Sequence, residues 1–299
     1  MVNMSKPKPR FSIVIPCFNE GKFIGRTLES LSQQSFKDFE VIVVDNNSYD
    51  NTIQVAKSYG VKVERESRRG VCWAREAGTQ AANGEIVIST DADTVFKENW
   101  LEKIDLTFRN NECIAVAGPC AYHDGPWWAK LYPKLLFGAV ATYNRITGKV
   151  FYVTATNLAF KKMVWSGYDT SLTQGGDEVG LLNSLQKKGK VVFINHNPVY
   201  TSGRRLYKGM AHAIFVTFIY HYVIAYNANR WLKRPVIGMA PAYREDRPLM
   251  VRRFKLYRLA LLAVLILFVS MAHIPGHDTL VQQAHETYSF VEKTIKSKI

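Results

Sequence analysis

The sequence has few cysteines, and they lack the spacing of a disulfide framework. The 299 residues include four cysteines, Cys17, Cys72, Cys113 and Cys120, and no Cys-x-x-Cys pair. A chain of this length can bury a large apolar core and does not need disulfides to fold. We therefore expect reduced thiols and a cytosolic compartment.

The sequence is also short of acidic residues and lacks a leader segment. Lys and Arg outnumber Asp and Glu by 39 to 25, for a formal charge of +14. This excess indicates an anionic partner: nucleic acid, a phosphate-bearing substrate or an acidic lipid surface. The first ten residues are basic and interrupted by proline, and the apolar run that follows is broken by Pro16 and Asn19. This is not the pattern of a secretory signal, so we expect this part of the chain to stay where it is made.

A pair of aspartates, Asp91 and Asp93, follows the short apolar run Ile86-Val87-Ile88. In an extended chain, side chains two residues apart project to the same side, so the two carboxylates should converge on one point. Like charges at this separation repel each other unless a cation lies beside them. Hard oxygen ligands suit Mg²⁺ or Mn²⁺, which usually also take phosphate oxygens of a substrate. The pair predicts a metal and diphosphate site, with an ordinary surface turn as the alternative.

Strands and helices are predicted to alternate along the first ninety residues. Apolar residues at helical spacing indicate a helix over 22–34, and a basic loop at 68–70 opens another. Buried strands are predicted by four β-branched apolar runs, at 11–16, 39–44, 61–63 and 86–88. This alternation is typical of an α/β fold with a doubly wound, mostly parallel sheet, in which ligands bind at the carboxyl ends of strands. Asp91 and Asp93 lie at such an end.

Four motifs occur in the order and spacing of one protein family. They are IVIPCFNE at 13–20, VVDNNSYD at 43–50, the segment from Arg69-Gly70 to Ala74-Arg75, and Asp91-Ala92-Asp93. Together they resemble the family 2 glycosyltransferases of the GT-A fold, closely over about 11–95 and more loosely to about residue 203. The resemblance implies a fold that binds a nucleotide-diphospho-sugar and moves its sugar to an acceptor.

The resemblance also implies roles for residues of these motifs. The loop after the first strand and the acidic turn after the second would hold the nucleotide, and Asp91 and Asp93 would hold Mg²⁺ or Mn²⁺ on the diphosphate. The residues implied to border the nucleotide or the donor are Pro16, Phe18, Glu20, Asp45, Asn46, Arg69, Arg75 and Asp91. Arginines beside a loop at a helix N-terminus are a natural phosphate environment, with a solvated basic face as the alternative.

Two later segments are expected to face the acceptor. Residues 150–162 are predicted to return to the sheet, and the resemblance makes Asn157 a candidate acceptor contact. After two glycines, Asp177 and Glu178 precede a predicted helix, for which a simple helix cap is one explanation. In the family, one carboxylate of such a pair removes the proton of the acceptor hydroxyl, which is a poor nucleophile without a base. We favour Asp177 as this base, with Glu178 close behind.

The segment after the last predicted strand carries a histidine and two arginines. Arg204 and Arg205 are candidates to meet the donor diphosphate or an acceptor phosphate. His196 is a candidate third metal ligand, with an ordinary hydrogen-bonded histidine as the alternative. Processive members of the family carry a Gln-x-x-Arg-Trp motif in this region, and no such sequence occurs here. Its absence favours a non-processive hexosyltransferase over a polymer synthase.

The C-terminal part differs in composition from the rest. Residues 256–274 form an apolar run of about the minimum length of a membrane-spanning helix. We expect one membrane helix there, with a buried core helix or a dimer seam as the alternative, and an interfacial segment over 209–227. We thus divide the chain into a GT-A domain, 1–205, and a helical membrane-associated region, 206–299.

Two features predict contact with the cytoplasmic face of the cell membrane. Trp127, Trp128 and Tyr132 are amphipathic aromatics of the kind found at a bilayer interface or against a sugar, although packing under a loop is the alternative. A basic collar precedes the apolar run and favours anionic lipid; it consists of Arg244, Arg247, Arg252, Arg253, Lys255 and Arg258.

Together these features predict a metal-dependent inverting glycosyltransferase that uses a UDP- or GDP-sugar. Asp91 and Asp93 would place the metal on the diphosphate, where it neutralises the charge that develops on the leaving nucleotide. Asp177 or Glu178 would deprotonate an acceptor hydroxyl, which attacks the anomeric carbon from the opposite face. The apolar, basic tail suggests a membrane-borne acceptor such as a polyprenyl phosphate or a lipid-linked glycan of the cell envelope. We expect no nucleic acid partner.

Two other classes of protein stay open from the sequence. A nucleotidyl or phosphoryl transferase would also place a metal on a diphosphate, although no loop of the GxxxxGK[ST] form is present. A non-catalytic membrane-associated protein that binds nucleotide sugars is the other, but it would have little reason to keep both acidic pairs. Assays with UDP- and GDP-sugars, with and without Mn²⁺, separate the three.

Overall fold

The computed structural model describes residues 8–170 and 177–225, together with Ala228 and Leu232. The chain divides into two compact units, 1–245 and 246–299, and all described residues lie in the first. The predicted helix at 256–274 lies outside the described residues, and the predicted domain boundary after residue 205 stays a prediction. In the described part of the chain, no helix is both long and apolar enough to cross a bilayer.

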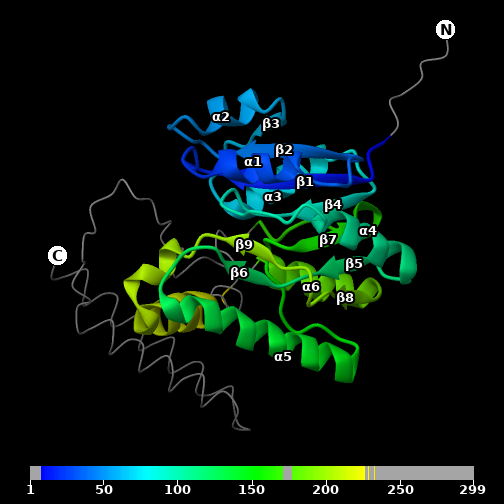
Figure 1. The fold of residues 1–299 in the computed structure, drawn as a ribbon, viewed down its shortest axis with the longest axis vertical. Helices are drawn as coiled ribbons and strands as arrows, with labels where there is room; N and C mark the ends of the chain where they lie inside the picture. Colours follow the sequence, from blue (N-terminus) through cyan, green and yellow to red (C-terminus); the bar gives the residue numbers. More distant parts are fainter. Residues whose placement is uncertain (1–7, 171–176, 226–227, 229–231, 233–299) are drawn as a thin grey trace, which may run out of the picture. The chain divides into compact units, whose positions relative to one another are not determined.

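A seven-stranded sheet in the order β3-β2-β1-β4-β7-β5-β8 forms the centre of this unit (Figure 1). Strand β7 is antiparallel to its neighbours β4 and β5, and the remaining pairs of this sheet are parallel. The prediction of a mostly parallel α/β sheet is therefore confirmed. The strands are β1 (Phe11–Cys17), β2 (Phe39–Asp45), β3 (Lys62–Arg65), β4 (Ile86–Ser89), β5 (Ala115–Ala117), β7 (Leu158–Lys161) and β8 (Val191–Phe193).

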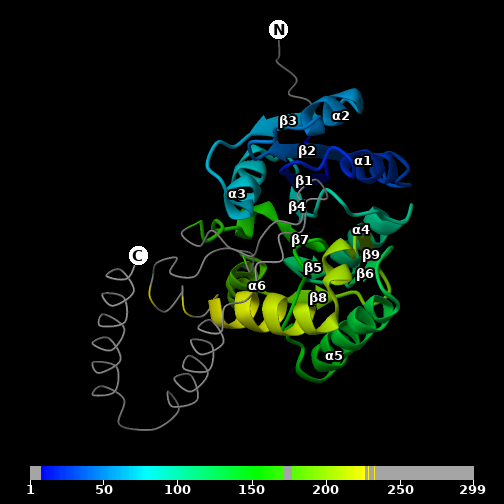
Figure 2. The ribbon, with the colours of Figure 1, turned by 90° about the vertical axis from the view of Figure 1, so that its left-hand side faces the viewer.

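Helices cover both faces of the sheet, which explains why its central strands are apolar at most positions. In β1, Ile13 and Ile15 point into the core under α1 (Ile24–Ser32) and α4 (Trp100–Asn110), while Val14 points to the opposite core. That second core is built from α3 (Val71–Ala81), α5 (Leu131–Thr147) and α6 (Asp177–Lys188). Figure 2 shows α1 and α3 on opposite sides of β1. The remaining α-helix, α2 (Thr52–Ser58), joins β2 to β3.

A two-stranded parallel sheet lies beside the carboxyl end of β4 and was not predicted. It pairs β6 (Cys120–Tyr122) with β9 (Val199–Thr201), and Tyr200 also bridges to Val95, just past the two aspartates. Helix η1 (Trp127–Lys130) follows β6, and η2 (Lys162–Val164) follows β7. After β9 come η3 (Arg204–Lys208) and the longer η4 (His212–Ala225). The small sheet thus brings η3 next to the end of β4, as the ion pair between Arg204 and Asp93 also shows.

Candidate active site

A cavity of about 610 Å³ lies at the carboxyl ends of β1 and β4. Parallel strands that share a sheet end at the same edge, so loops from distant parts of the sequence meet there. Of the residues predicted from the sequence, the cavity lining contains Pro16, Phe18, Glu20, Asn46, Arg69, Arg75, Asp91, Asp93, Asp177, Glu178, Arg204 and Arg205. The structure therefore brings most of the candidate residues together.

Asp91 and Asp93 both line this cavity, on the turn that follows β4. The hydroxyl of Thr27 in α1 donates to the carbonyl of Ala92 at 2.7 Å and so anchors the turn between them. The Thr201 hydroxyl donates to Asp93 Oδ1 at 2.9 Å. Burial and the nearby charge of Asp91 raise the pKa of Asp93. The charge of Asp91 thus disfavours the ionised form of Asp93, and a divalent cation beside the two carboxylates would relieve this.

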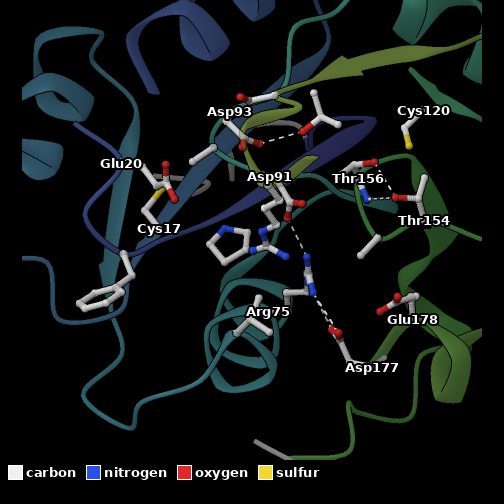
Figure 3. A pocket seen from close by; sticks show the side chains of 18 of the residues that line it. Cys17, Glu20, Arg75, Asp91, Asp93, Cys120, Thr154, Thr156, Asp177 and Glu178 are labelled. Carbon is white, nitrogen blue, oxygen red and sulfur yellow. Dashed lines mark hydrogen bonds and ion pairs between the residues drawn. The ribbon is translucent and has the colours of Figure 1, made fainter. Parts of the chain in front are cut away.

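Arg75 connects this turn to the acidic pair at the start of α6 (Figure 3). Its Nη2 lies 2.8 Å from Asp91 Oδ1, and its Nη1 donates to both oxygens of Asp177, at 3.0 and 2.8 Å. The side chains of Arg75 and Asp177 are 5% and 0% exposed, against 38% for Asp91. One buried guanidinium therefore compensates two carboxylates, and only Asp91 reaches solvent to a substantial degree.

Two glycines allow α3 to pack in the position that brings Arg75 to the cavity. Gly70 precedes the helix with φ 136°, a conformation that favours glycine. Gly78 lies one turn after Arg75, where a Cβ atom would clash with Val14 and would lie 2.7 Å from Val44 Cγ2. The absent side chain lets α3 approach the sheet closely, and this sets the depth of Arg75 in the cavity.

Arg204 forms a second link, between η3 and the loop after β1. Its guanidinium contacts both oxygens of Glu20 at 3.0 and 3.1 Å and lies 3.2 Å from Asp93 Oδ2. The same group lies 4.4 Å from the ring centroid of Phe23, a cation–π distance. Glu20 and Arg204, predicted as separate donor contacts, are thus partners of each other on one wall of the cavity.

The turn after β2 organises the basic loop. Asn46 donates from Nδ2 to the carbonyls of Glu66 and Arg68, at 2.8 and 2.7 Å, and its Oδ1 accepts from the Gly70 amide at 2.8 Å. Asp45 is 5% exposed and accepts a hydrogen bond from the Ser48 amide at 3.1 Å. Asp45 is not among the residues that line the cavity within the described chain, so its contact with a nucleotide stays a prediction.

The two acidic residues that begin α6 differ in environment. Asp177 has both oxygens held by Arg75, whereas Glu178 lies beside Asp177 on the cavity wall (Figure 3). Burial, followed by the negative charge of Asp177, raises the pKa of Glu178 to about 8. Glu178 is therefore the carboxylate of the pair that can exchange a proton near neutral pH.

Two predicted site residues lie elsewhere. Asn157 is 3% exposed: its Oδ1 accepts from Trp100 Nε1 at 3.1 Å, and its Nδ2 donates to the carbonyls of Pro119 and Asn197 at 3.0 and 2.9 Å. It fixes loops around β5 and is not among the described residues that line the cavity, so its contact with an acceptor stays a prediction. His196 is exposed and lines a separate small hollow beside α4, so it is not positioned as a third ligand with Asp91 and Asp93.

Apart from Tyr132, which was predicted to lie at a bilayer interface or against a sugar, the apolar part of the cavity wall was not predicted as part of the site. It is formed by Tyr122, by Tyr132, Pro133, Leu136 and Phe137 of α5, and by Tyr152. Thr154 and Thr156 add hydroxyl groups, which share a hydrogen bond of 2.8 Å, and Cys120 lies next to them (Figure 3). The aromatic cluster at 127–132 was a signal in the sequence, but nothing local connected it to the aspartates.

The donor atoms of the site suit a hard divalent cation. Mg²⁺ is commonly bound by one or two carboxylates and completes its shell with water and phosphate oxygens. Asp91 and Asp93 supply two carboxylates that line the same cavity. Within the described residues, no group of three or more His, Cys, Asp and Glu side chains could hold a metal.

The fold and this cavity define an α/β protein with a ligand cavity at the carboxyl ends of its strands, and comparison with known proteins gives the family. The family model described as "Glycosyl transferase family 2" matches residues 12–167. This match covers more than half of the chain, and the chain belongs to that family. The predicted resemblance is thereby confirmed.

Curated relatives match about half of this chain. The poly(ribitol-phosphate) beta-N-acetylglucosaminyltransferase TarP of Staphylococcus aureus is 28% identical over 165 residues, which are 52% of this chain and 50% of the relative. The glucosyl-dolichyl phosphate glucuronosyltransferase of Haloferax volcanii is 23% identical over 188 residues, 56% of this chain and 59% of the relative. The chain therefore spans little more than half the length of these relatives.

Solved structures show the same fold. The mannosyltransferase PcManGT of Pyrobaculum calidifontis, in complex with GDP-Man and Mn²⁺, is 20% identical in sequence and has a TM-score of 0.56. The match covers 65% of this chain and 57% of PcManGT. Residues 1–349 of S. aureus TarS, in complex with UDP-GlcNAc, are 19% identical in sequence and have a TM-score of 0.54. The match covers 65% of this chain and 59% of the TarS chain. These likenesses establish the fold.

Proposed function

We propose that the protein is a metal-dependent inverting glycosyltransferase that moves one hexose from a UDP- or GDP-sugar to a membrane-borne or cell-envelope acceptor. One observation carries the proposal: a single cavity holds Asp91 and Asp93, the arginines Arg75 and Arg204, and the carboxylates of Asp177 and Glu178. Cations and hard-metal ligands suit a diphosphate, and a carboxylate of raised pKa suits proton transfer from a hydroxyl.

The donor half of the cavity lies between the loop after β1 and the basic loop before α3. Pro16, Phe18, Asn46 and Arg69 line it and would border the nucleotide. Asp91 and Asp93 would hold Mg²⁺ or Mn²⁺, which when bound neutralises charge on the diphosphate as the nucleotide leaves. Arg205 and Arg69 add positive charge to the lining, although Arg75 and Arg204 are already engaged by carboxylates. The donor phosphates would compete for these arginines.

The acceptor half lies toward α6 and α5. Glu178 would accept the proton of the acceptor hydroxyl, and Asp177 would keep Arg75 in place and hold the pKa of Glu178 high. This order reverses the preference drawn from the sequence, because both oxygens of Asp177 are occupied by Arg75. The hydroxyl would then attack the anomeric carbon on the face opposite the nucleotide, with inversion.

The names of related proteins support the substrate classes. TarP is named for transfer to poly(ribitol phosphate), and the Haloferax enzyme for transfer to glucosyl-dolichyl phosphate. The solved relatives bind UDP-GlcNAc or GDP-Man with Mn²⁺. They favour a nucleotide-sugar donor, a divalent metal and a phosphate-bearing glycan or lipid acceptor.

The test is a product assay with a panel of UDP- and GDP-sugars, polyprenyl phosphate or cell-envelope polymer as acceptor, and Mn²⁺ or chelator. We expect release of a nucleoside diphosphate and a glycosylated acceptor only with metal. Glu178→Gln should keep donor binding, measured by titration calorimetry, but lose transfer by at least about a hundredfold. Release of a sugar 1-phosphate, with the nucleoside monophosphate moved to the acceptor, would identify a nucleotidyl transferase instead. Donor binding without turnover on any acceptor would favour the non-catalytic alternative.

A further inference from the structure

Helix α5 is apolar on both of its faces. Pro133, Phe137 and Val140 are buried against the rest of the unit. At 3.6 residues per turn, Leu131, Leu135 and Ile146 fall within about 60° of one another on the opposite side. Their exposed fractions are 53%, 65% and 77%. A surface helix normally presents polar residues on its outer face, so this apolar stripe needs an explanation.

The stripe continues into the turn before α5. Trp127 in η1 is 81% exposed and precedes Leu131 by four residues. Trp127, Leu131, Leu135 and Ile146 are called the α5 face below. An exposed tryptophan at the end of an apolar stripe is typical of a segment that lies in the interface of a bilayer, where the indole meets the headgroup region.

The charges beside the α5 face have one sign. Lys130, Lys134, Arg145 and Lys149 are all exposed. The sequence contains no Asp or Glu from residue 125 to residue 168. On the helix, Lys134 and Arg145 flank one edge of the stripe. An apolar face flanked only by cations matches a surface of acyl chains under anionic headgroups, and a protein partner would have to be both apolar and acidic.

The position of α5 gives this face access to a membrane. In Figures 1 and 2, α5 lies along the border of the described part, on the side opposite α2 and β3. Its inner residues Tyr132, Pro133, Leu136 and Phe137 line the cavity. A helix that contacts lipid on one side and the cavity on the other would place the cavity mouth beside the bilayer.

We propose that the α5 face docks the protein on an anionic bilayer, with its four apolar side chains at the acyl boundary and the neighbouring cations on lipid phosphates. This docking does not depend on the 256–274 segment or on the transfer reaction, and its test uses no activity.

The first measurement is partition of the full chain into sedimented vesicles of phosphatidylcholine, with and without phosphatidylglycerol. Leu135→Glu should reduce partition into the anionic vesicles by at least about tenfold, because it places a negative charge in the contact. Leu106→Glu on α4 is the matched control, since Leu106 is also an exposed helical leucine, at 49%, and should change partition by less than about twofold. Equal partition of Leu135→Glu and the control would overturn the proposal.

The second measurement locates the contact, in case another segment holds the chain on the vesicles. An environment-sensitive fluorophore is attached to Leu135→Cys or, as control, to Leu106→Cys; the native cysteines are buried or half-buried. At position 135 we expect a blue shift on anionic vesicles and quenching by spin-labelled lipid, and at position 106 neither. The absence of lipid quenching at position 135 would overturn the proposal. So would a blue shift that appears without lipid, increases with protein concentration and accompanies dimer formation; that result would assign the α5 face to contact with a second copy of the chain.

Discussion

Arg75 shows how one residue can couple two parts of a site. A buried guanidinium is favourable only with well-placed anions around it, and here Asp91 and Asp177 are hydrogen-bonded to separate nitrogens. Asp91 belongs to the turn after β4, and Asp177 begins α6. The guanidinium therefore holds the candidate metal turn and the candidate proton acceptor in a fixed relation.

Removing Arg75 should destabilise the fold strongly. Arg75→Met leaves the fully buried carboxylate of Asp177 without its counter-charge, and breaking a buried pair in this way costs about 3–5 kcal/mol. The matched control is Arg109→Met, which removes a surface arginine, 65% exposed, from its pair with Asp105 and should cost less than about 1 kcal/mol. Urea unfolding followed by circular dichroism measures both. Similar losses for the two variants would contradict the assigned role.

Glu178 should make stability fall with pH across the neutral range. Because its pKa is raised from 4.5 to about 8 in the folded state, the folded protein binds this proton more tightly than the unfolded chain between those values. Its contribution is fully present below about pH 4.5 and is lost as pH rises through about 8. The unfolding free energy of wild type relative to Glu178→Gln should decline over this window in urea titrations. Glu112→Gln, at an exposed position, is the control and should show no such trend.

Charged residues were easier to assign from the sequence than polar ones. Asp91, Asp93, Arg69 and Arg75 of the motifs do reach the cavity, whereas Asp45 does not line it. The role of Asn157 stays a prediction, because an amide serves equally well to cross-link loops and its three partners come from segments far along the chain. The direction that His196 faces was not predictable, because a histidine after a strand carries no sign of it.

At the scale of elements, local pattern predicted the strands that are buried on both sides. β1, β2 and β4 are continuous apolar runs, which is what a sheet covered on both faces requires. The insertion of β7 between β4 and β5 was not predictable in detail, because strand order depends on tertiary packing. The three-residue strands β6 and β9 were missed since they pair across a long sequence separation and are too short for periodicity.

Two helical glycines offer a matched pair of substitutions at this scale. Gly78→Ala places a methyl group against Val14 and Val44, so α3 must move away from the sheet, at a cost of about 1–3 kcal/mol. Gly138→Ala in α5 meets no atom within 4 Å and should stabilise the protein by about 0.5–1 kcal/mol through helix propensity. Thermal and urea unfolding give both values. A stabilising Gly78→Ala would contradict the close packing of α3.

At the scale of the molecule, the charges are unevenly distributed along the chain. The net charge is +14, yet five acidic residues, Glu20, Asp91, Asp93, Asp177 and Glu178, line one cavity together with four arginines. The segment 125–168, which contains α5, has no acidic residue. An excess of cations is thus present in the segment that contains α5 and not in the cavity lining, and a count of residues over the whole chain could not have distinguished the two.

Ligand binding at the cavity should stabilise the whole unit, because its lining comes from segments spread from residue 16 to residue 205. A ligand that binds only the folded state at a hundredfold excess over its Kd adds about 2.7 kcal/mol. We expect a nucleoside diphosphate and Mn²⁺ together to raise Tm by more than the sum of their separate effects, since the diphosphate supplies oxygens that Asp91 and Asp93 alone do not. Asp93→Asn should keep the nucleotide effect and lose the added effect of metal, while Asp38→Asn, at an exposed position, keeps both. An additional rise that persists in Asp93→Asn would show that the metal is held elsewhere, and one that persists under chelator would show that it does not come from the metal.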